Sequence, residues 1–327
     1  MYKTIRVVVL STVSISALGF ALLALAARTQ PIKTVADLVL AVGSPYVTLV
    51  ALLGLCLAAS CRRVALSIAA VGVLVATLAV QVSWYYLGRP VTIGEHVSLR
   101  VLSSNLRYGQ ADPSFLVGLA KDGADVITLS ELTPEAVQRF QQAGIDKTFP
   151  YSQLIPSAGA GGIGMWSRYP LTSLSAPRHR GVTIPVARLQ IPGLATEPLL
   201  ASVHVTSPVA EEHNTVAEWR SGMASAKAQL ANFADSAGFG AVIVGGDYNS
   251  TPDMLQFREL LTDGYRDAVE QLGAGFAPTF PSNRWYPPLI TIDHILTHNA
   301  AASSIRTVEV PGSDHRALLA TIELPTG

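Results

Sequence analysis

Residues 241–250, AVIVGGDYNS, decide the fold class of this chain. The first six are apolar or glycine, which is typical of a short buried β-strand. An acid and an amide, Asp247 and Asn249, follow at the end of that strand. Asp-Tyr-Asn after a strand is also the composition of a simple turn, so this segment alone leaves open a turn or a catalytic site.

The same arrangement, a polar side chain at the end of an apolar strand, recurs through the later part of the chain. Further strands are predicted at 97–101, 125–130, 199–206, 290–297, 305–310 and 317–324. The polar residues that accompany these strands are Asn105, Glu131, His204, Asp293, His294, Asp314 and His315. Side chains held at the ends of rigid strands can converge on one site.

Several of these residues have a structural explanation as well. Glu131 is placed to cap a following helix, and a lone histidine such as His204 is commonly a hydrogen-bonded interior residue. Asp293 is harder to explain in this way, because it interrupts the apolar run 290–296 and an unpaired buried carboxylate is costly. The ordered set as a whole therefore favours a catalytic centre.

Helices are predicted between the strands, at 113–121, 133–143 and 211–237. Asp112 is an N-cap signal for the first helix, and Thr133-Pro134-Glu135 opens the second. Strands outnumber helices, and the mixture predicts an α/β (α+β) domain over residues 96–327.

Three runs without a charged residue precede this domain, at about 7–27, 38–60 and 64–88. Each is long enough for the ~20 residues that a helix needs to cross a bilayer. Residues 1–89 are therefore predicted to be a multi-pass anchor of three transmembrane helices in the cell membrane. Residues 90–95 are the predicted linker.

Basic residues at the ends of these runs predict the orientation of the anchor. Lys3 and Arg6 precede the first run, and Arg62-Arg63 forms the turn between the second and third. The positive-inside rule places both in the cytoplasm, so the domain after residue 89 is predicted to be extracytoplasmic. Ala24-Leu25-Ala26 also resembles a signal-peptidase site, and cleavage there leaves the same orientation with two crossings.

Composition excludes several classes of protein. Only 14% of the residues are charged, against about a quarter in soluble chains, and the net charge is zero. Both cysteines, Cys56 and Cys61, lie in the anchor, so the domain offers no cysteine nucleophile. Neither a P-loop nor a Gly-Xaa-Ser-Xaa-Gly elbow occurs, which leaves ATP hydrolysis and acyl transfer without support.

The ordered set of polar residues, together with Ser167-Arg168-Tyr169-Pro170, resembles the endonuclease/exonuclease/phosphatase (DNase I-like) superfamily over roughly residues 97–325. The resemblance implies a two-sheet β-sandwich flanked by helices, and metal-assisted hydrolysis of a phosphoester. The layout with a membrane anchor resembles a bacterial subgroup associated with glycopeptide-antibiotic resistance.

The resemblance also implies a metal site. Glu131 is the expected main ligand of Mg²⁺, with Mn²⁺ as the alternative, and Asn105 and Asp314 are the expected further ligands. Mg²⁺ prefers a few protein oxygens together with water and substrate phosphate.

The remaining residues carry the catalytic roles that the resemblance implies. Asp247 is expected to deprotonate the attacking water, and Asn249 to donate a hydrogen bond to the phosphate. His315 is expected to contact the phosphate while Asp293 holds its ring. His204 is expected to assist at the leaving group, whereas His294 is expected to pack or support the site.

The substrate is predicted from charge and location. Residues after 89 hold 16 basic and 22 acidic side chains, which disfavours affinity for DNA. The anchor favours a substrate already at the membrane, and the segment 285–288, Trp-Tyr-Pro-Pro, is either an apolar lip for a lipid headgroup or a rigid surface loop.

We therefore predict a metal-dependent phosphoesterase that acts outside the cytoplasm on a lipid-linked phosphate or pyrophosphate. An extracytoplasmic nuclease is the alternative, and a non-catalytic binding or resistance protein is the alternative from another class. The intact set of acids, amides and histidines argues against the last.

Overall fold

The computed structural model describes residues 2–174, 182–210 and 215–327. The described chain divides into two compact units. Met1–Leu87 and the short segment Pro252–Leu255 form the first, and Gly88–Thr251 with Gln256–Gly327 forms the second.

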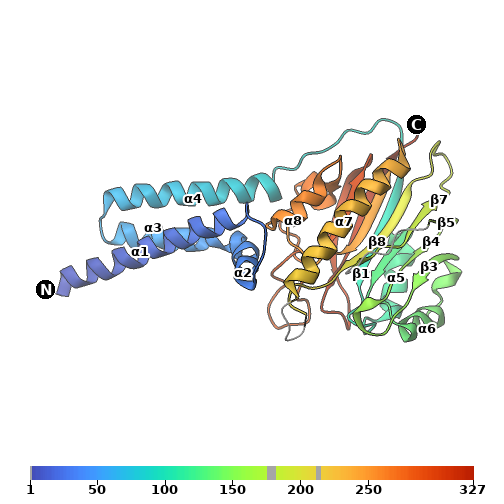
Figure 1. Cartoon of the computed structure of the whole chain (residues 1–327), viewed down its shortest axis with the longest axis horizontal. Coiled ribbons are helices and arrows are strands. Elements are labelled where there is room, and N and C mark those ends of the chain that lie inside the picture. Colours follow the sequence, from blue (N-terminus) through green and yellow to red (C-terminus); the bar gives the residue numbers. More distant parts are fainter. Residues whose placement is uncertain (1, 175–181, 211–214) are drawn as a thin grey trace. The chain divides into compact units, whose positions relative to one another are not determined.

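The first unit is helical. It contains α1 (Tyr2–Ala27), α2 (Val35–Gly43), α3 (Val47–Ser60) and α4 (Val64–Tyr85) (Figure 1). The second predicted run is divided between α2 and α3 by a 3₁₀ turn, Ser44–Tyr46. Pro45 lies in this turn and lacks the backbone N–H that a continuous helix would use.

Three spans of this unit are long and apolar enough to cross a membrane: Thr4–Ala27, Val35–Ser60 and Val64–Tyr85. Small side chains such as Ala21, Ala24 and Ala51 are buried between the helices, while Leu22 and Leu23 are about half exposed. Small residues inside and large apolar residues outside suit helices that face lipid. The three predicted apolar helices are thus confirmed.

The first unit contains one buried charged network. Asp253 is fully buried and pairs with Arg28. Its carboxylate also accepts hydrogen bonds from Ser44 Oγ at 3.0 Å and Tyr85 Oη at 2.6 Å. These partners compensate the cost of burying the carboxylate.

The second unit is built on two sheets. The first has the order β12-β13-β1-β2-β4-β3, and the second has the order β10-β11-β9-β8-β7-β5 with β6 paired to β8. The strands are β1 (His96–Asn105), β2 (Val126–Ser130), β3 (Tyr151–Ile155), β4 (Ile163–Ser167), β5 (Leu171–Leu174), β6 (Val182–Thr183), β7 (Val186–Leu189), β8 (Leu199–Val205), β9 (Val242–Asp247), β10 (Arg266–Asp267), β11 (Asp293–His298), β12 (Ala301–Glu309) and β13 (Arg316–Pro325).

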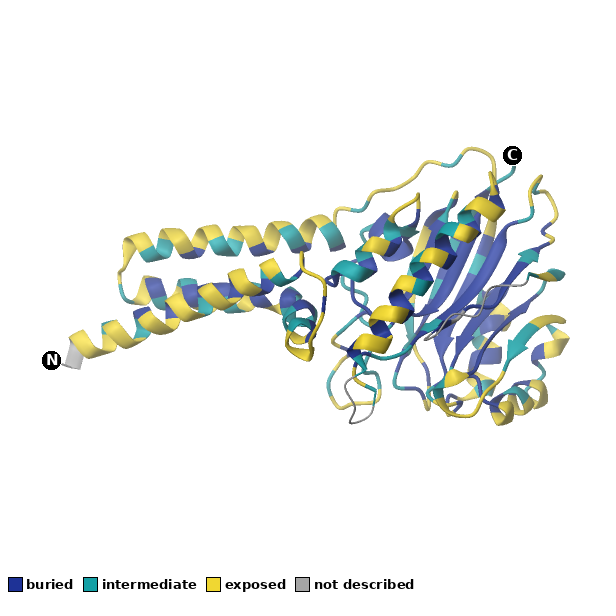
Figure 2. Ribbon diagram, viewed as in Figure 1, coloured by how far each residue is buried: buried dark blue, intermediate teal, exposed yellow. Residues whose placement is uncertain are grey.

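Side chains alternate between the two faces of each strand, and this alternation produces two separate apolar clusters. Leu99 and Val101 of β1 pack into the core between the sheets, together with Ile243 of β9 and Ile295 of β11. Leu102 of β1 points the other way, as the period of two requires, and joins a second cluster. The central strands β2, β4, β8, β9 and β11 are accordingly deeply buried (Figure 2).

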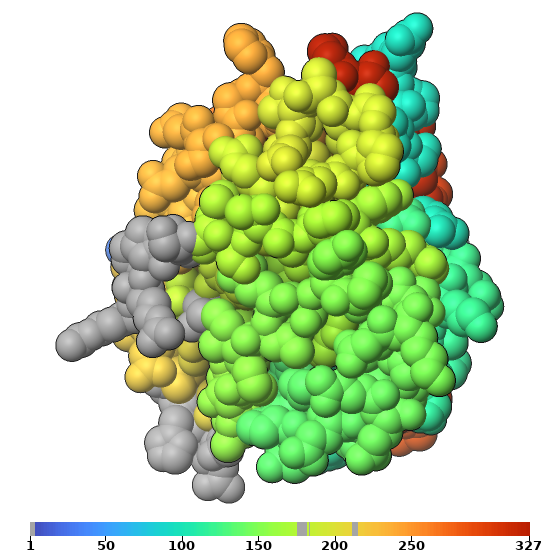
Figure 3. Space-filling model, turned by 90° about the vertical axis from the view of Figure 1, so that its right-hand side faces the viewer, coloured from blue at the N-terminus to red at the C-terminus, as the bar shows by residue number. Residues whose placement is uncertain are grey.

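Helices cover the outer faces of both sheets. The longer ones are α5 (Pro113–Gly123), α6 (Pro134–Gln142) and α7 (Val216–Ala237), and the short ones are α8 (Leu255–Arg258) and α9 (Ala268–Leu272). Leu116 and Phe140, from α5 and α6, pack in the second cluster. The long helix α7 contacts β8 and β9. The predicted two-sheet sandwich flanked by helices is confirmed. Figure 3 views this unit from the side of β3 and β5.

One predicted helix extends over residues that the structure does not describe, and one predicted strand begins too early. The helix predicted at 211–237 is observed from Val216, and residues 211–214 lie outside the described part of the chain. The strand predicted at 290–297 begins only at Asp293. Ile290 instead forms an isolated bridge with Phe280, so Asp293 starts a strand rather than interrupting one.

Candidate active site

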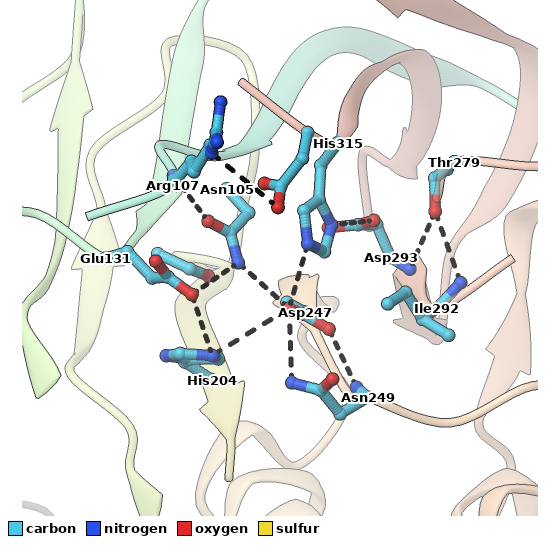
Figure 4. A network of polar contacts seen from close by, with 12 residues as sticks. Asn105, Arg107, Glu131, His204, Asp247, Asn249, Thr279, Ile292, Asp293 and His315 are labelled. Carbon is cyan, nitrogen blue, oxygen red and sulfur yellow. Dashed lines mark hydrogen bonds and ion pairs between the residues drawn. The ribbon is translucent and has the colours of Figure 1, made fainter. Parts of the chain in front are cut away.

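Strand pairing brings the polar residues of the sequence to one edge of the sandwich. Strands β1 and β2 run parallel. Asn105 at the end of β1 and Glu131 just after β2 therefore lie at the same edge of the first sheet. In the second sheet His204 of β8 pairs with Asp247 of β9, and Asp247 pairs with Asp293 at the start of the antiparallel β11. The two sheets thus supply one polar cluster (Figure 4).

Asp247 lies at the centre of this cluster and is almost fully buried. Its Oδ2 accepts a hydrogen bond from Asn105 Nδ2 at 2.9 Å, and its Oδ1 accepts one from the backbone N–H of Asn249 at 2.7 Å. Burial, followed by repulsion from Asp293, raises the pKa of Asp247 to about 6, although His315 and His204 act in the opposite direction. The Asp247 carboxyl is therefore suited to accept and release a proton near neutral pH.

His315 forms a buried pair with Asp293. Its Nδ1 lies 2.8 Å from Asp293 Oδ2, and its Nε2 lies 3.9 Å from Asp247 Oδ2. Burial alone would lower the pKa of His315, but the charge and hydrogen bond of Asp293 raise it to about 10. The ring is consequently protonated at neutral pH, with one N–H available on the side of Asp247.

Thr279 holds the backbone of Asp293, the carboxylate partner of His315. The fully buried Thr279 Oγ1 accepts the backbone N–H groups of Ile292 and Asp293, at 3.2 and 3.3 Å. This contact joins residues 13 and 14 positions apart, so no local sequence pattern predicts the role of Thr279.

Glu131 and His204 complete the cluster. Glu131 Oε1 lies 3.2 Å from Asn105 Nδ2, and Oε2 accepts the backbone N–H of Tyr108 at 2.6 Å. His204 Nε2 lies 3.9 Å from Glu131 Oε1 and 3.8 Å from Asp247 Oδ2. His204 Nδ1 contacts the carbonyl of Ala160 at 3.0 Å, which assigns the Nδ1 proton to that hydrogen bond and turns Nε2 toward the carboxylates.

Two residues of the cluster have backbone conformations that are uncommon outside glycine. Glu131 has φ +58° and Asn249 has φ +47°. Asparagine tolerates this region, but glutamate does so at a cost of order 1–3 kcal/mol. Strain of this kind persists where the surrounding structure holds the residue in place, and it is concentrated at functional sites.

The side chains of Asn105 and Asp314, two of the predicted metal ligands, both contact Arg107. The amide oxygen of Asn105 accepts the backbone N–H of Arg107 at 2.8 Å, and the amide nitrogen faces the carboxylates. Asp314 Oδ2 lies 3.8 Å from Arg107 Nε. Their assignment as metal ligands stays a prediction.

One group of described residues places potential metal-ligand atoms within 4.8 Å of one another: Asp247, Asp293 and His315. Asn105 Nδ2 contacts both Glu131 Oε1 and Asp247 Oδ2, so the Glu131 carboxylate lies beside this group. Oxygen donors of this kind fit a hard divalent cation.

His294 lies behind the cluster rather than in it. Its ring is fully buried, with Nδ1 3.0 Å from Asp267 Oδ2 and Nε2 2.9 Å from the carbonyl of Ser250.

This arrangement can be compared with known proteins. The model of the Endonuclease/Exonuclease/phosphatase family matches residues 102–315, about two thirds of the chain. The chain belongs to this family. By family it is a hydrolase that acts on phosphoester bonds. A search of the curated proteins found no match.

Solved structures share the fold of the second unit. TDP2 of D. rerio, complexed with a single-strand DNA product, has a TM-score of 0.52 and 18% identity, over 69% of this chain and 98% of that one. An endonuclease/exonuclease/phosphatase from Bacteroides vulgatus has a TM-score of 0.54 and 17% identity, over 70% and 99%. A family protein from Bacteroides thetaiotaomicron has a TM-score of 0.55 and 12% identity, over 71% and 100%.

Proposed function

We propose that this protein is a membrane-anchored, divalent-metal-dependent phosphoesterase that hydrolyses a lipid-linked phosphate or pyrophosphate outside the cytoplasm. The observation that carries the proposal is the buried array of Asp247, His315 and Asp293, with Glu131 and Asn105 beside it. Three candidate membrane spans in the same chain support a substrate that resides in the bilayer.

Asp247 and His315 do the proton chemistry in this proposal. Asp247 orients the attacking water and takes its proton, in keeping with its pKa of about 6. His315, kept positive by Asp293, donates its free N–H to a phosphoryl oxygen. His204 stands beside both carboxylates and assists at the leaving oxygen.

Asn249 holds the Asp247 carboxylate in place. Its Nδ2 donates to the carbonyl of Val205 at 2.9 Å and lies 3.3 Å from Asp247 Oδ2. When a phosphate oxygen replaces Asp247 Oδ2 as the acceptor, the amide can donate to it, as an aspartate at this position cannot.

Glu131 would be the main ligand of the divalent cation, with Mg²⁺ as the proposed ion and Mn²⁺ as the alternative. Enzymes of this family depend on divalent metals. A bound cation supplies Lewis-acid stabilisation of charge at the phosphoryl group. The ligand roles of Asn105 and Asp314 are part of this proposal.

An apolar loop next to His315 supports a lipid-linked substrate. The Phe280 ring lies 4.9 Å from the His315 ring, centroid to centroid, and begins a segment that ends at Ile290. Within it Trp285 is 95% exposed and its ring meets Tyr286 edge-on. Aromatic rings with a polar edge are suited to the interface between lipid and water.

A nuclease is the second candidate. Its support is the fold shared with a TDP2 structure that holds a single-strand DNA product. The acidic excess of the residues after 89 argues against it, because affinity for nucleic acid draws on basic side chains.

A substrate panel distinguishes these candidates. The full chain in detergent is offered polyprenyl pyrophosphate, phospholipid vesicles and plasmid DNA, each with Mg²⁺ and with excess EDTA. Release of phosphate from the polyprenyl compound, abolished by EDTA and by Asp247→Asn, is expected. Cleavage of DNA alone supports the nuclease, and no metal-dependent product from any substrate contradicts the proposal.

A further inference from the structure

A buried ion pair lies directly behind the active site and has no place in the proposed chemistry. His294, the second residue of β11, is fully buried, and its two ring nitrogens contact Asp267 Oδ2 and the Ser250 carbonyl at 3.0 and 2.9 Å. A carboxylate and a carbonyl are both acceptors, so the ring that makes both hydrogen bonds donates from each nitrogen. Asp267 Oδ1 also accepts the backbone N–H of Val269 at 3.1 Å.

Aromatic contacts fix the orientation of the His294 ring. Phe257 stacks on it at a centroid distance of 4.1 Å, and Tyr248 meets it edge-on at 5.8 Å. The ring therefore has little freedom to turn, and without exposure it cannot touch a substrate.

The carbonyl that His294 holds belongs to the segment 247–250, which carries Asp247 and Asn249 out of the sheet. This segment is also held by the backbone N–H of Tyr248, which donates to Ile292 O at 3.0 Å. A third contact is the bond from Trp219 Nε1 to Ser250 Oγ at 3.0 Å. Asn249 has φ +47° between these contacts, a conformation that needs such support.

We propose that His294 is a positioning residue for catalysis. Its Nε2–H bond to the Ser250 carbonyl holds the segment 247–250 so that Asp247 faces His315 and Asn249 stays against Asp247. Asp267 keeps the ring oriented for this bond. The inference rests on the proposed function for its kinetic test, but the hydrogen bond itself has a test that needs no activity.

Three substitutions at position 294 separate the hydrogen bond from the volume of the ring. His294→Phe keeps an aromatic ring on Phe257 and removes both donors. His294→Gln carries its amide nitrogen to about the place of Nε2, whereas His294→Asn carries it to about the place of Nδ1. Gln therefore restores the bond to Ser250, and Asn restores only the side toward Asp267.

The kinetic test uses the full chain with bis(p-nitrophenyl) phosphate at saturating Mg²⁺. His294→Phe and His294→Asn are expected to lower kcat by about 10- to 100-fold, as small misplacements of catalytic groups do. KM is expected to stay within about threefold, and His294→Gln to recover most of kcat. Equal kcat for the Gln and Asn variants, or wild-type kcat in His294→Phe, overturns the proposal.

The second test is hydrogen exchange of the peptide that covers 247–251, with a peptide from β1 as the internal control. Faster exchange in His294→Asn than in His294→Gln, with β1 unchanged, is expected. Equal exchange in the two variants overturns the proposal. If the wild type hydrolyses neither bis(p-nitrophenyl) phosphate nor polyprenyl pyrophosphate, the proposed function is contradicted, and the exchange comparison still decides the role of His294. The Gln and Asn comparison remains decisive if His294→Phe does not fold.

Discussion

Asp247 and Asp293 are opposite each other on neighbouring strands, and these two carboxylates control the protonation of the site. The pKa of Asp247 is raised to about 6 and that of His315 to about 10. The reaction needs Asp247 deprotonated and His315 protonated. We therefore expect kcat/KM to rise with pH near 6 and to fall near 10.

The substitution Asp293→Asn tests the cause of both the acidic and the alkaline limb of this pH profile. Asp293 raises the pKa of Asp247 and of His315, so the loss of its charge should move both limbs to lower pH. Asp235→Asn, which removes an exposed carboxylate on α7, is the matched control and should leave the profile unchanged. An alkaline limb that stays near 10 in Asp293→Asn is incompatible with the assigned pair.

Asp247 and His315 should also behave as one catalytic unit. Asp247→Asn or His315→Ala is expected to lower kcat by ~10²–10⁴-fold, the range of positioned acid–base groups. The double variant should be little slower than the slower single one, because groups that act together have non-additive effects. Strictly multiplicative losses would show that the two residues act separately.

At the scale of the elements, Gly246 sets how closely β9 can approach β8. A Cβ at Gly246 would lie 2.0 Å from the Val203 carbonyl oxygen, and its φ is +155°. Gly246→Ala is therefore expected to destabilise the protein by about 1–3 kcal/mol and lower Tm, since the strand before Asp247 would have to shift.

Gly118→Ala is the matched control for this substitution. Gly118 is exposed on α5 and a Cβ there has open space, so alanine should raise Tm slightly through its higher helix propensity. An equal Tm in the two variants, measured on the full chain, would mean that the backbone contact at Gly246 does not constrain the sheet.

Much of the arrangement of the strands could be predicted from the sequence. The apolar run 241–246, followed by the polar residues Asp247 and Asn249, predicts a strand that ends at these residues, and the structure has β9 there. The start of β11 was misplaced because Ile290 belongs to a bridge with Phe280, a partner that hydrophobic pattern alone does not reveal. The orientation of the Asn105 amide could not be predicted either, because the Arg107 backbone N–H and tertiary contacts determine it.

At the scale of the molecule, the orientation in the membrane follows from a few basic residues. Lys3, Arg6 and the Arg62-Arg63 turn favour the cytoplasmic side, which predicts that the second unit is outside. Protease added to intact spheroplasts should then degrade the second unit. Arg62→Glu with Arg63→Glu should reduce this degradation by weakening the topology signal. Complete protection of the wild type until lysis would reverse the orientation.

The proposed activity of the whole molecule is hydrolysis of a lipid-linked phosphate or pyrophosphate at the membrane with the help of a divalent cation. The most direct measurement is the initial rate of phosphate release from polyprenyl pyrophosphate in liposomes that contain the full chain. We expect release with Mg²⁺, none in excess EDTA, a rate restored by added Mg²⁺, and a sharply reduced rate in Glu131→Gln and Asp247→Asn at unchanged Tm. Undiminished release in EDTA, or from both variants, would contradict the account.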